Sequence, residues 1–85
     1  FSLSQNYPNP FNPSTKIRFE LSESSFAELE IYDAKGKLAE NLFGRQLTAG
    51  SYEVNWNAAA LPSGVYFYRF KAGDFSETRK MILIK

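Results

Sequence analysis

Apolar and polar residues alternate along most of the chain with a period of two. In residues 15–21 the apolar side chains fall at every second position, and residues 27–32 and 51–56 repeat the pattern. Such alternation is typical of β-strands that turn one face toward a core. The residues predicted to face the core in these three segments are Ile17, Phe19, Leu21, Ala27, Leu29, Ile31, Tyr52, Val54 and Trp56.

Three further strands are predicted at residues 37–43, 65–70 and 75–84. Residues 33–36 resemble a type I turn closed by a glycine, and residues 65–70 are apolar on both faces, which favours a central strand. No segment shows helical periodicity, and turn signals recur about every ten residues. The sequence therefore predicts an all-β fold, an immunoglobulin-like antiparallel β-sandwich of about seven strands, the seventh being a short strand within residues 2–7.

The first 14 residues differ from the rest because three prolines, Pro8, Pro10 and Pro13, fall within six positions. Proline has no backbone N–H and pushes the preceding residue toward extended geometry, so neither a helix nor a strand can run through residues 6–13. We predict one domain: a stiff proline-rich segment at residues 1–14, then a sandwich at residues 15–85. Because the chain starts at Phe1 rather than at methionine, we expect it to be a piece of a longer protein.

The composition argues against several classes of function. The chain has no cysteine and no histidine, which removes thiol chemistry, sulfur-bound zinc and the usual general base. A net charge of +1 from scattered basic residues gives no patch for nucleic acid or anionic membranes. No apolar run approaches the ~18–20 residues of a membrane span. Glu28 and Glu30 are predicted to lie on a solvated sheet face, and Asp33 and Asp74 in turns, so we expect no catalytic residue, metal or cofactor.

Aromatic side chains are more numerous than one small core requires. We predict a core containing Phe19, Tyr52, Trp56 and Phe67. The aromatic residues that cannot all join them are Tyr7, Phe11, Tyr32, Tyr66 and Tyr68. Two interpretations follow: Tyr7 and Phe11 pack across one end of the sandwich to hold the proline-rich segment, or a row of exposed rings stacks on sugars. The second would make the chain a carbohydrate-binding or fibronectin-like accessory module of a polysaccharide-degrading enzyme.

The last residues, 80–85, form a β-prone apolar run that ends in Lys85. We predict an edge strand whose apolar face packs on Leu29 and Phe67 and whose end is exposed. A partner could recognise such a strand by adding a strand of its own along the edge.

Five ordered motifs carry a resemblance to a known family. They are YPNPFNP at 7–13, IYD at 31–33 with Gly36, AGSYEVNW at 49–56, SGVYFYR at 63–69 and RKMILIK at 79–85. Each motif alone is common, but the ordered set covers nearly the whole chain. It resembles the type A C-terminal sorting domain of the type IX (Por) secretion system, found on exported proteins of the Bacteroidetes and their relatives.

The resemblance implies a folded signal at the end of a larger passenger protein, often a hydrolase or an adhesin. Such a domain is expected to meet the secretion machinery in the periplasm and to pass through an outer-membrane translocon. In many members a sortase-like peptidase then removes the domain and joins the passenger to the cell surface, whereas other passengers are released. No cofactor is implied.

The resemblance also assigns residues to recognition by the sorting machinery. They are Asn9, Pro10, Phe11 and Asn12, then Gly64, Val65 and Tyr66, and finally Lys80, Met81, Ile82, Leu83, Ile84 and Lys85. One departure from the family pattern is Asn57, where aspartate is common.

Overall fold

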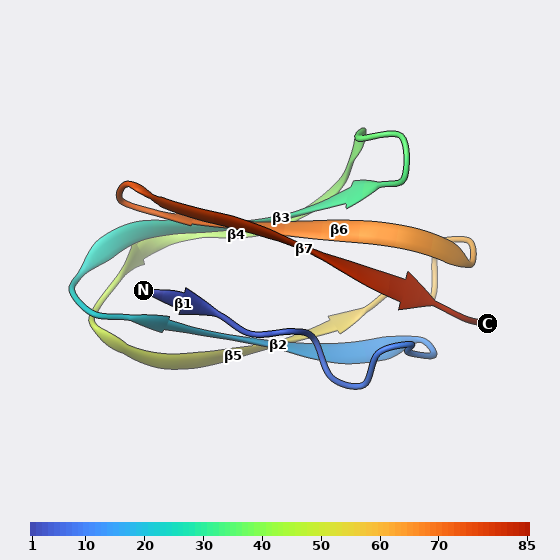
Figure 1. The fold of residues 1–85 in the computed structure, drawn as a ribbon, viewed down its shortest axis with the longest axis horizontal. Helices are drawn as coiled ribbons and strands as arrows, with labels where there is room; N and C mark the ends of the chain where they lie inside the picture. Colours follow the sequence, from blue (N-terminus) through green and yellow to red (C-terminus); the bar gives the residue numbers. More distant parts are fainter.

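The computed structural model describes all of residues 1–85 and forms a sandwich of two antiparallel sheets (Figure 1). The smaller sheet has the order β1-β2-β5 and the larger one the order β4-β3-β6-β7. The strands are β1 (Ser2–Leu3), β2 (Ser14–Leu21), β3 (Ser25–Asp33), β4 (Leu38–Leu47), β5 (Gly50–Asn57), β6 (Gly64–Ala72) and β7 (Phe75–Leu83). The all-β sandwich predicted from the sequence is confirmed.

Each predicted strand is present, and the order of the sheets confirms two predictions about position. Strand β6 lies between β3 and β7, and β7 lies at an edge. Strand β4 runs to Leu47, four residues past its predicted end at residue 43, as an edge strand that is mostly exposed. Two register shifts opposite β3 interrupt its alternation, which is why the pattern of apolar residues did not reveal its full length.

The core lies between the inner faces of the two sheets, as the alternation predicted. Phe19 of β2 is at its centre, with its ring centroid 4.5 Å from that of Phe70 and 5.3 Å from that of Tyr52. Tyr52 and Val54 are only partly buried, because β5 is an edge strand of the smaller sheet. The predicted inward residues that are fully buried are Ile17, Phe19, Leu21, Ala27, Leu29, Ile31 and Trp56.

The prediction that Phe67 belongs to the core is wrong. Tyr66 and Tyr68 of β6 are buried, and Phe67 lies between them on the outer face, beside Lys80 of β7. Phe67 therefore cannot hold the inward apolar face of β7, where Met81 lies opposite Tyr66 instead. In a strand that is apolar on both faces, polar and apolar residues do not alternate. The sequence pattern therefore could not show which residues of β6 face the core.

The buried tyrosines of β6 satisfy their hydroxyl groups with backbone acceptors. Tyr66 donates to the carbonyl of Pro62 at 2.7 Å, and Tyr68 donates to the carbonyl of Ser4 at 2.7 Å. A buried phenol needs such a partner, because an unpaired hydroxyl in a core is costly. These two hydrogen bonds tie the central strand to the β5–β6 loop and to the N-terminal segment.

Candidate interaction surface at the end of the last strand

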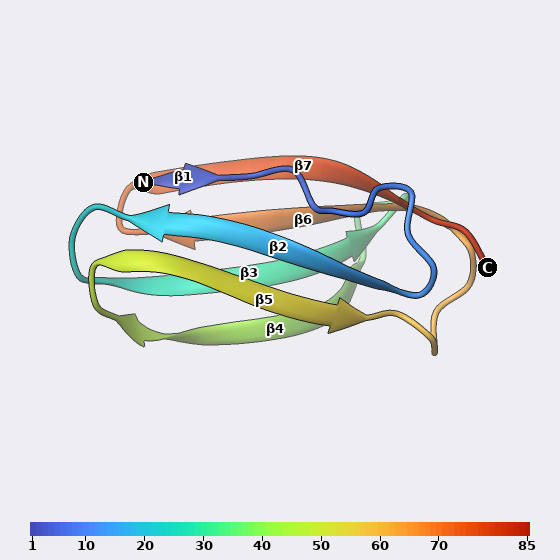
Figure 2. The same ribbon diagram turned by 90° about the horizontal axis from the view of Figure 1, so that it is seen from below.

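Three segments that the sequence singled out meet at one end of the sandwich. In the pairing of β6 with β7, Gly64 lies opposite Leu83 and Val65 opposite Ile82. On the other side of β7, Phe11 forms a parallel bridge to Leu83. Figure 2 shows the proline-rich segment crossing beside the end of β7. Residues from both ends of the chain thus form one surface.

Residues 9–11 close the outer edge of β7, and we refer to them as the clasp. The N–H of Phe11 donates to the carbonyl of Ile82 at 3.0 Å, and the N–H of Ile84 donates to the carbonyl of Phe11 at 2.9 Å. The N–H of Ile82 donates to the side-chain oxygen of Asn9 at 2.9 Å. The backbone groups that β7 would offer to a new strand at these positions are therefore already paired.

The clasp changes what a partner can recognise. A partner strand cannot pair with the edge of the last strand at residues 82–84, because the clasp already pairs with these residues. The clasp does not present a regular new edge in its place, because Pro10 within it, and Pro8 and Pro13 beside it, have no N–H to donate. A partner at this end of the folded domain can reach side chains but not the ladder groups of the last strand.

Phe11 anchors the clasp, whereas Tyr7 does not. The Phe11 side chain is 2% exposed, and its ring centroid lies 5.8 Å from that of Trp56. Tyr7 is 79% exposed, although its backbone N–H and carbonyl both pair with Lys16 of β2. Of the two aromatic residues expected to hold the proline-rich segment by packing, Phe11 alone does so.

The side chains of the last strand divide between the core and the surface. Met81 and Leu83 are buried, whereas Lys80 and Ile84 are exposed and Ile82 is half-buried on the opposite face. Beyond the strand, Lys85 donates its N–H to Ser63 Oγ at 3.1 Å and its ammonium to the carbonyl of Ala59. The chain end is thereby fixed to the β5–β6 loop.

The outward side chains of β6 and β7 form a continuous apolar area, which we call the tail patch. It pairs Val65 with Ile82 and Phe67 with Lys80 across the two strands. Ile84, which is 52% exposed, continues it directly after the end of β7. Cross-strand neighbours on one face of a sheet contact each other directly. The members of the tail patch are Val65, Phe67, Lys80, Ile82 and Ile84.

Four of the thirteen residues assigned to recognition are buried in the core: Phe11, Tyr66, Met81 and Leu83. In the folded domain they stabilise the surface without being accessible to a partner. The residues of that set that reach solvent are Asn9, Pro10, Asn12, Gly64, Val65, Lys80, Ile82, Ile84 and Lys85.

The comparison with known protein families matches residues 5–85 to the secretion system C-terminal sorting domain. The match includes the clasp, the glycine-led start of β6 and the last strand. The chain belongs to this family. Sorting domains of this family are C-terminal signals for type IX secretion, so the chain is a sorting signal that interacts with the type IX machinery. Among curated proteins, none matches the chain.

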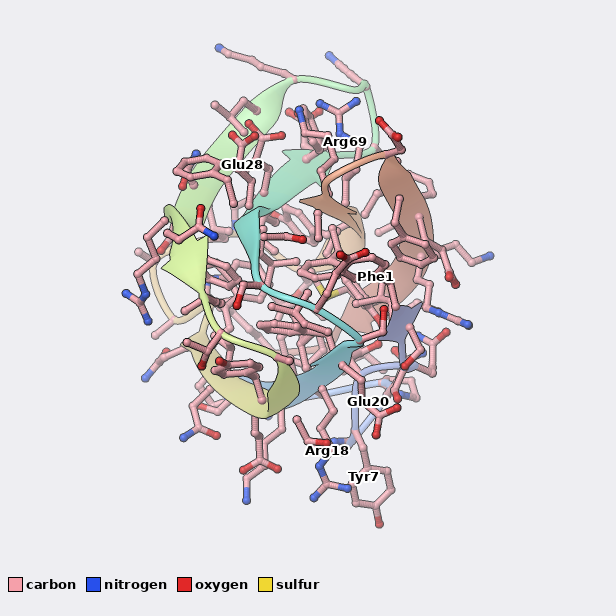
Figure 3. All side chains as sticks on the ribbon, turned by 90° about the vertical axis from the view of Figure 1, so that its left-hand side faces the viewer. Phe1, Tyr7, Arg18, Glu20, Glu28 and Arg69 are labelled. Carbon is pink, nitrogen blue, oxygen red and sulfur yellow. The ribbon has the colours of Figure 1, made fainter.

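Family membership decides between the two functions that the sequence left open. A sorting domain directs export to the cell surface or the extracellular space, and nothing supports the carbohydrate-binding interpretation. The most exposed aromatic side chains do not form the row that sugar stacking would need: Tyr7 projects beside Arg18 from the smaller sheet (Figure 3), and Phe26 belongs to the larger one. The structure contains no helix of the length and apolarity needed to cross a membrane.

The rest of the outer face of the larger sheet carries paired charges. Glu30 lies 3.2 Å from Arg69, whose guanidinium lies over the ring of Tyr32, and Glu28 lies 3.8 Å from Lys71. The Tyr32 hydroxyl donates to Glu30 at 2.9 Å and, together with Arg69, lowers the pKa of that carboxyl. The two glutamates predicted on a solvated face are half-buried in ion pairs, and Figure 3 shows Glu28 and Arg69 on the same outer face.

Sequence reasoning missed a buried polar network behind the clasp. Asn6 and Thr15 are the buried polar residues of the chain, and both bond to Pro8, Asn6 with its side-chain amide and Thr15 with its hydroxyl. Asn6 also donates its backbone N–H to the Tyr68 hydroxyl at 2.8 Å. One signal was present in the sequence: Thr15 stands in the inward register of β2, two residues before Ile17.

Proposed function

We propose that the type IX machinery recognises this sorting domain in its folded form, through the side chains of the tail patch. The observation that supports the proposal is that the clasp closes the β7 edge while Ile82 and Ile84 remain on the surface. Side chains, rather than the backbone ladder, are then the accessible part of the last strand.

The chemistry of the tail patch indicates the kind of partner surface that fits it. Lys80 lies within the patch and Lys85 lies next to Ile84 at its end, and no carboxylate side chain pairs with either lysine. A shallow hollow lined by Tyr32, Phe67 and Arg69 adjoins it. The matching surface is an apolar groove with carboxylates at its rim, because apolar contacts in the centre and opposite charges at the edge are the usual arrangement of protein interfaces.

The proposal includes the wider setting that the family suggests. Residues 1–85 act as one sorting domain behind a larger passenger, which travels through the periplasm and an outer-membrane translocon before a sortase-like peptidase removes the domain. The domain itself performs no catalysis. The lack of histidine and cysteine supports this point, as does the lack of any group of three or more acidic, histidine or cysteine side chains placed to hold a metal ion.

Export of a reporter protein tests the proposal, provided that the variants remain folded. Deleting residues 80–85 would remove Met81 and Leu83 from the core and confuse misfolding with loss of recognition. The sharper variant is Ile84→Ser, with Phe26→Ser as its control. The two side chains are 52% and 53% exposed; Ile84 directly follows β7, and Phe26 lies in β3 of the same sheet.

The assay places a signal peptide and a fluorescent reporter before each variant in a host with the type IX system. We expect Ile84→Ser to lower the secreted fraction and Phe26→Ser to leave it unchanged, with both domains folded by circular dichroism. Equal export of the two variants would contradict recognition through the tail patch.

A further inference from the structure

We propose that Tyr68 is a positioning residue of the sorting signal. Its buried hydroxyl fixes the point at which the N-terminal segment leaves the smaller sheet, and thereby places the clasp against β7. The inference rests on the proposed function only for its effect on export, because the positioning itself can be measured in the isolated chain.

The Tyr68 hydroxyl reaches from the larger sheet to the backbone of the N-terminal segment. It accepts the N–H of Asn6 at 2.8 Å and donates to the carbonyl of Ser4 at 2.7 Å. Ser4 still donates its own N–H to Arg18 of β2. The phenol therefore holds the segment where its pairing with β2 is interrupted, between Ser4 and the isolated bridge at Tyr7.

Further hydrogen bonds connect Asn6 to the clasp. The Asn6 amide donates to the carbonyl of Pro8 at 3.2 Å and to the Thr15 hydroxyl at 3.1 Å, and Thr15 donates to the same Pro8 carbonyl at 2.9 Å. Pro8 immediately precedes Asn9, whose side chain accepts the N–H of Ile82. A short chain of hydrogen bonds thus leads from Tyr68 to the edge of the last strand.

Burial makes this network specific. Tyr68, Asn6 and Thr15 are each at most 2% exposed, so water does not replace a lost partner. Removing the Tyr68 hydroxyl leaves a buried donor at Asn6 without a partner and removes the donor to the Ser4 carbonyl, and an unpaired buried group favours local opening. The opening that restores its hydration moves the N-terminal segment, and the clasp with it.

The chain offers a closely matched control at Tyr66. This residue is on the same strand, is also buried and also donates its hydroxyl to a carbonyl, but its acceptor is Pro62 in the β5–β6 loop. Tyr68→Phe and Tyr66→Phe therefore make the same chemical change, and only the first affects the clasp. Thr15→Val removes the second link of the network without using Tyr68.

Amide hydrogen exchange of the full 85-residue chain provides the test, read at the N–H groups of Phe11, Ile82 and Ile84. We expect exchange about tenfold faster or more in Tyr68→Phe and in Thr15→Val, and unchanged exchange at these amides in Tyr66→Phe. Amides of β3, which has a neighbouring strand on each side, serve as the internal reference for global stability. In the reporter assay, Tyr68→Phe is expected to lower secretion more than Tyr66→Phe.

Each alternative result counts against the inference. Equal exchange of the Phe11, Ile82 and Ile84 amides in the two tyrosine variants would show that the Tyr68 hydroxyl does not position the clasp. Faster exchange with unchanged export would show that the position of the clasp does not matter for sorting. The proposed function is tested by export of Ile84→Ser, which neither of these results involves. The inference can therefore fail without the proposed function failing.

Discussion

Phe11 donates its backbone N–H to the carbonyl of Ile82 at 3.0 Å, so that the proline-rich motif and the last strand lie side by side. In the sequence the two motifs stand at opposite ends of the domain. In the structure they form one surface, in which the first motif closes the edge of the second. The outer edge of β7 is thereby kept from pairing with other chains, a known hazard of exposed β-edges.

Substitution by alanine should destabilise the fold strongly at Phe11 and hardly at all at Tyr7, although both residues lie in the proline-rich segment. Phe11→Ala removes a buried ring that packs on Trp56, so we expect a loss of about 3–5 kcal/mol in the free energy of unfolding. Tyr7→Ala removes an exposed ring and should change it by less than about 0.5 kcal/mol. Urea denaturation followed by tryptophan fluorescence measures both. Similar losses in the two variants would contradict the placement of Phe11 in the core.

Tyr68 predicts a distinct alkaline stability profile. Burial raises the pKa of this phenol to about 12 from its ordinary value of 10. The neutral phenol therefore stabilises the fold fully below pH 10, and this contribution is lost as the pH rises from 10 through 12. A pKa shift of this size contributes about 2–3 kcal/mol at most to the free energy of unfolding.

The measurement for Tyr68 compares the free energy of unfolding of the chain with that of Tyr68→Phe between pH 8 and pH 12. Because phenylalanine does not titrate, the stability of the variant should fall less steeply over the upper part of this range. Parallel curves for the chain and Tyr68→Phe would rule out a buried, neutral Tyr68.

Tyr32 predicts a shift in the titration of Glu30. The Tyr32 hydroxyl bond is the largest cause that lowers the pKa of the Glu30 carboxyl, followed by Arg69. Tyr32→Phe removes this donor, so the pKa of Glu30 should rise toward the ordinary value of 4.5. A carboxyl titration by NMR measures the change, with Tyr52→Phe as a tyrosine that bonds elsewhere, to Thr48.

The hydrogen bond between Tyr32 and Glu30 also makes the stability of the fold depend on pH in the acid range. Since the pKa of Glu30 is lowered in the folded state, its interactions stabilise the fold above the ordinary pKa and are lost as the pH falls through the folded value. Tyr32→Phe should weaken this acid dependence. An unchanged Glu30 titration would mean that the hydroxyl bond is absent in solution.

The strands and the sandwich were predictable because alternation with a period of two is a local property of the sequence. It correctly placed Ile17, Phe19 and Leu21 in the core, and the same register would have placed Thr15 there. It could not orient β6, which is apolar on both faces. Phe67 was therefore assigned to the core, although Tyr66 and Tyr68 occupy it.

The arrangement of the candidate surface was not predictable, because it depends on contacts between distant segments. No local pattern indicates that Phe11 lies beside Leu83, or that Asn9 accepts the N–H of Ile82. The ion pairs of Glu28 and Glu30 likewise depend on which residues β6 brings opposite them. The resemblance identified the motifs, and the fold shows which of their side chains are accessible.

Photo-crosslinking in living cells tests recognition through the tail patch most directly. A photoreactive amino acid replaces Ile84 in one fusion protein and Phe26 in another, in a host with the type IX system. We expect an adduct with a component of the secretion machinery from position 84, absent from position 26 and absent when that component is deleted. Adducts of equal yield from both positions, or from position 26 alone, would contradict recognition at the tail patch.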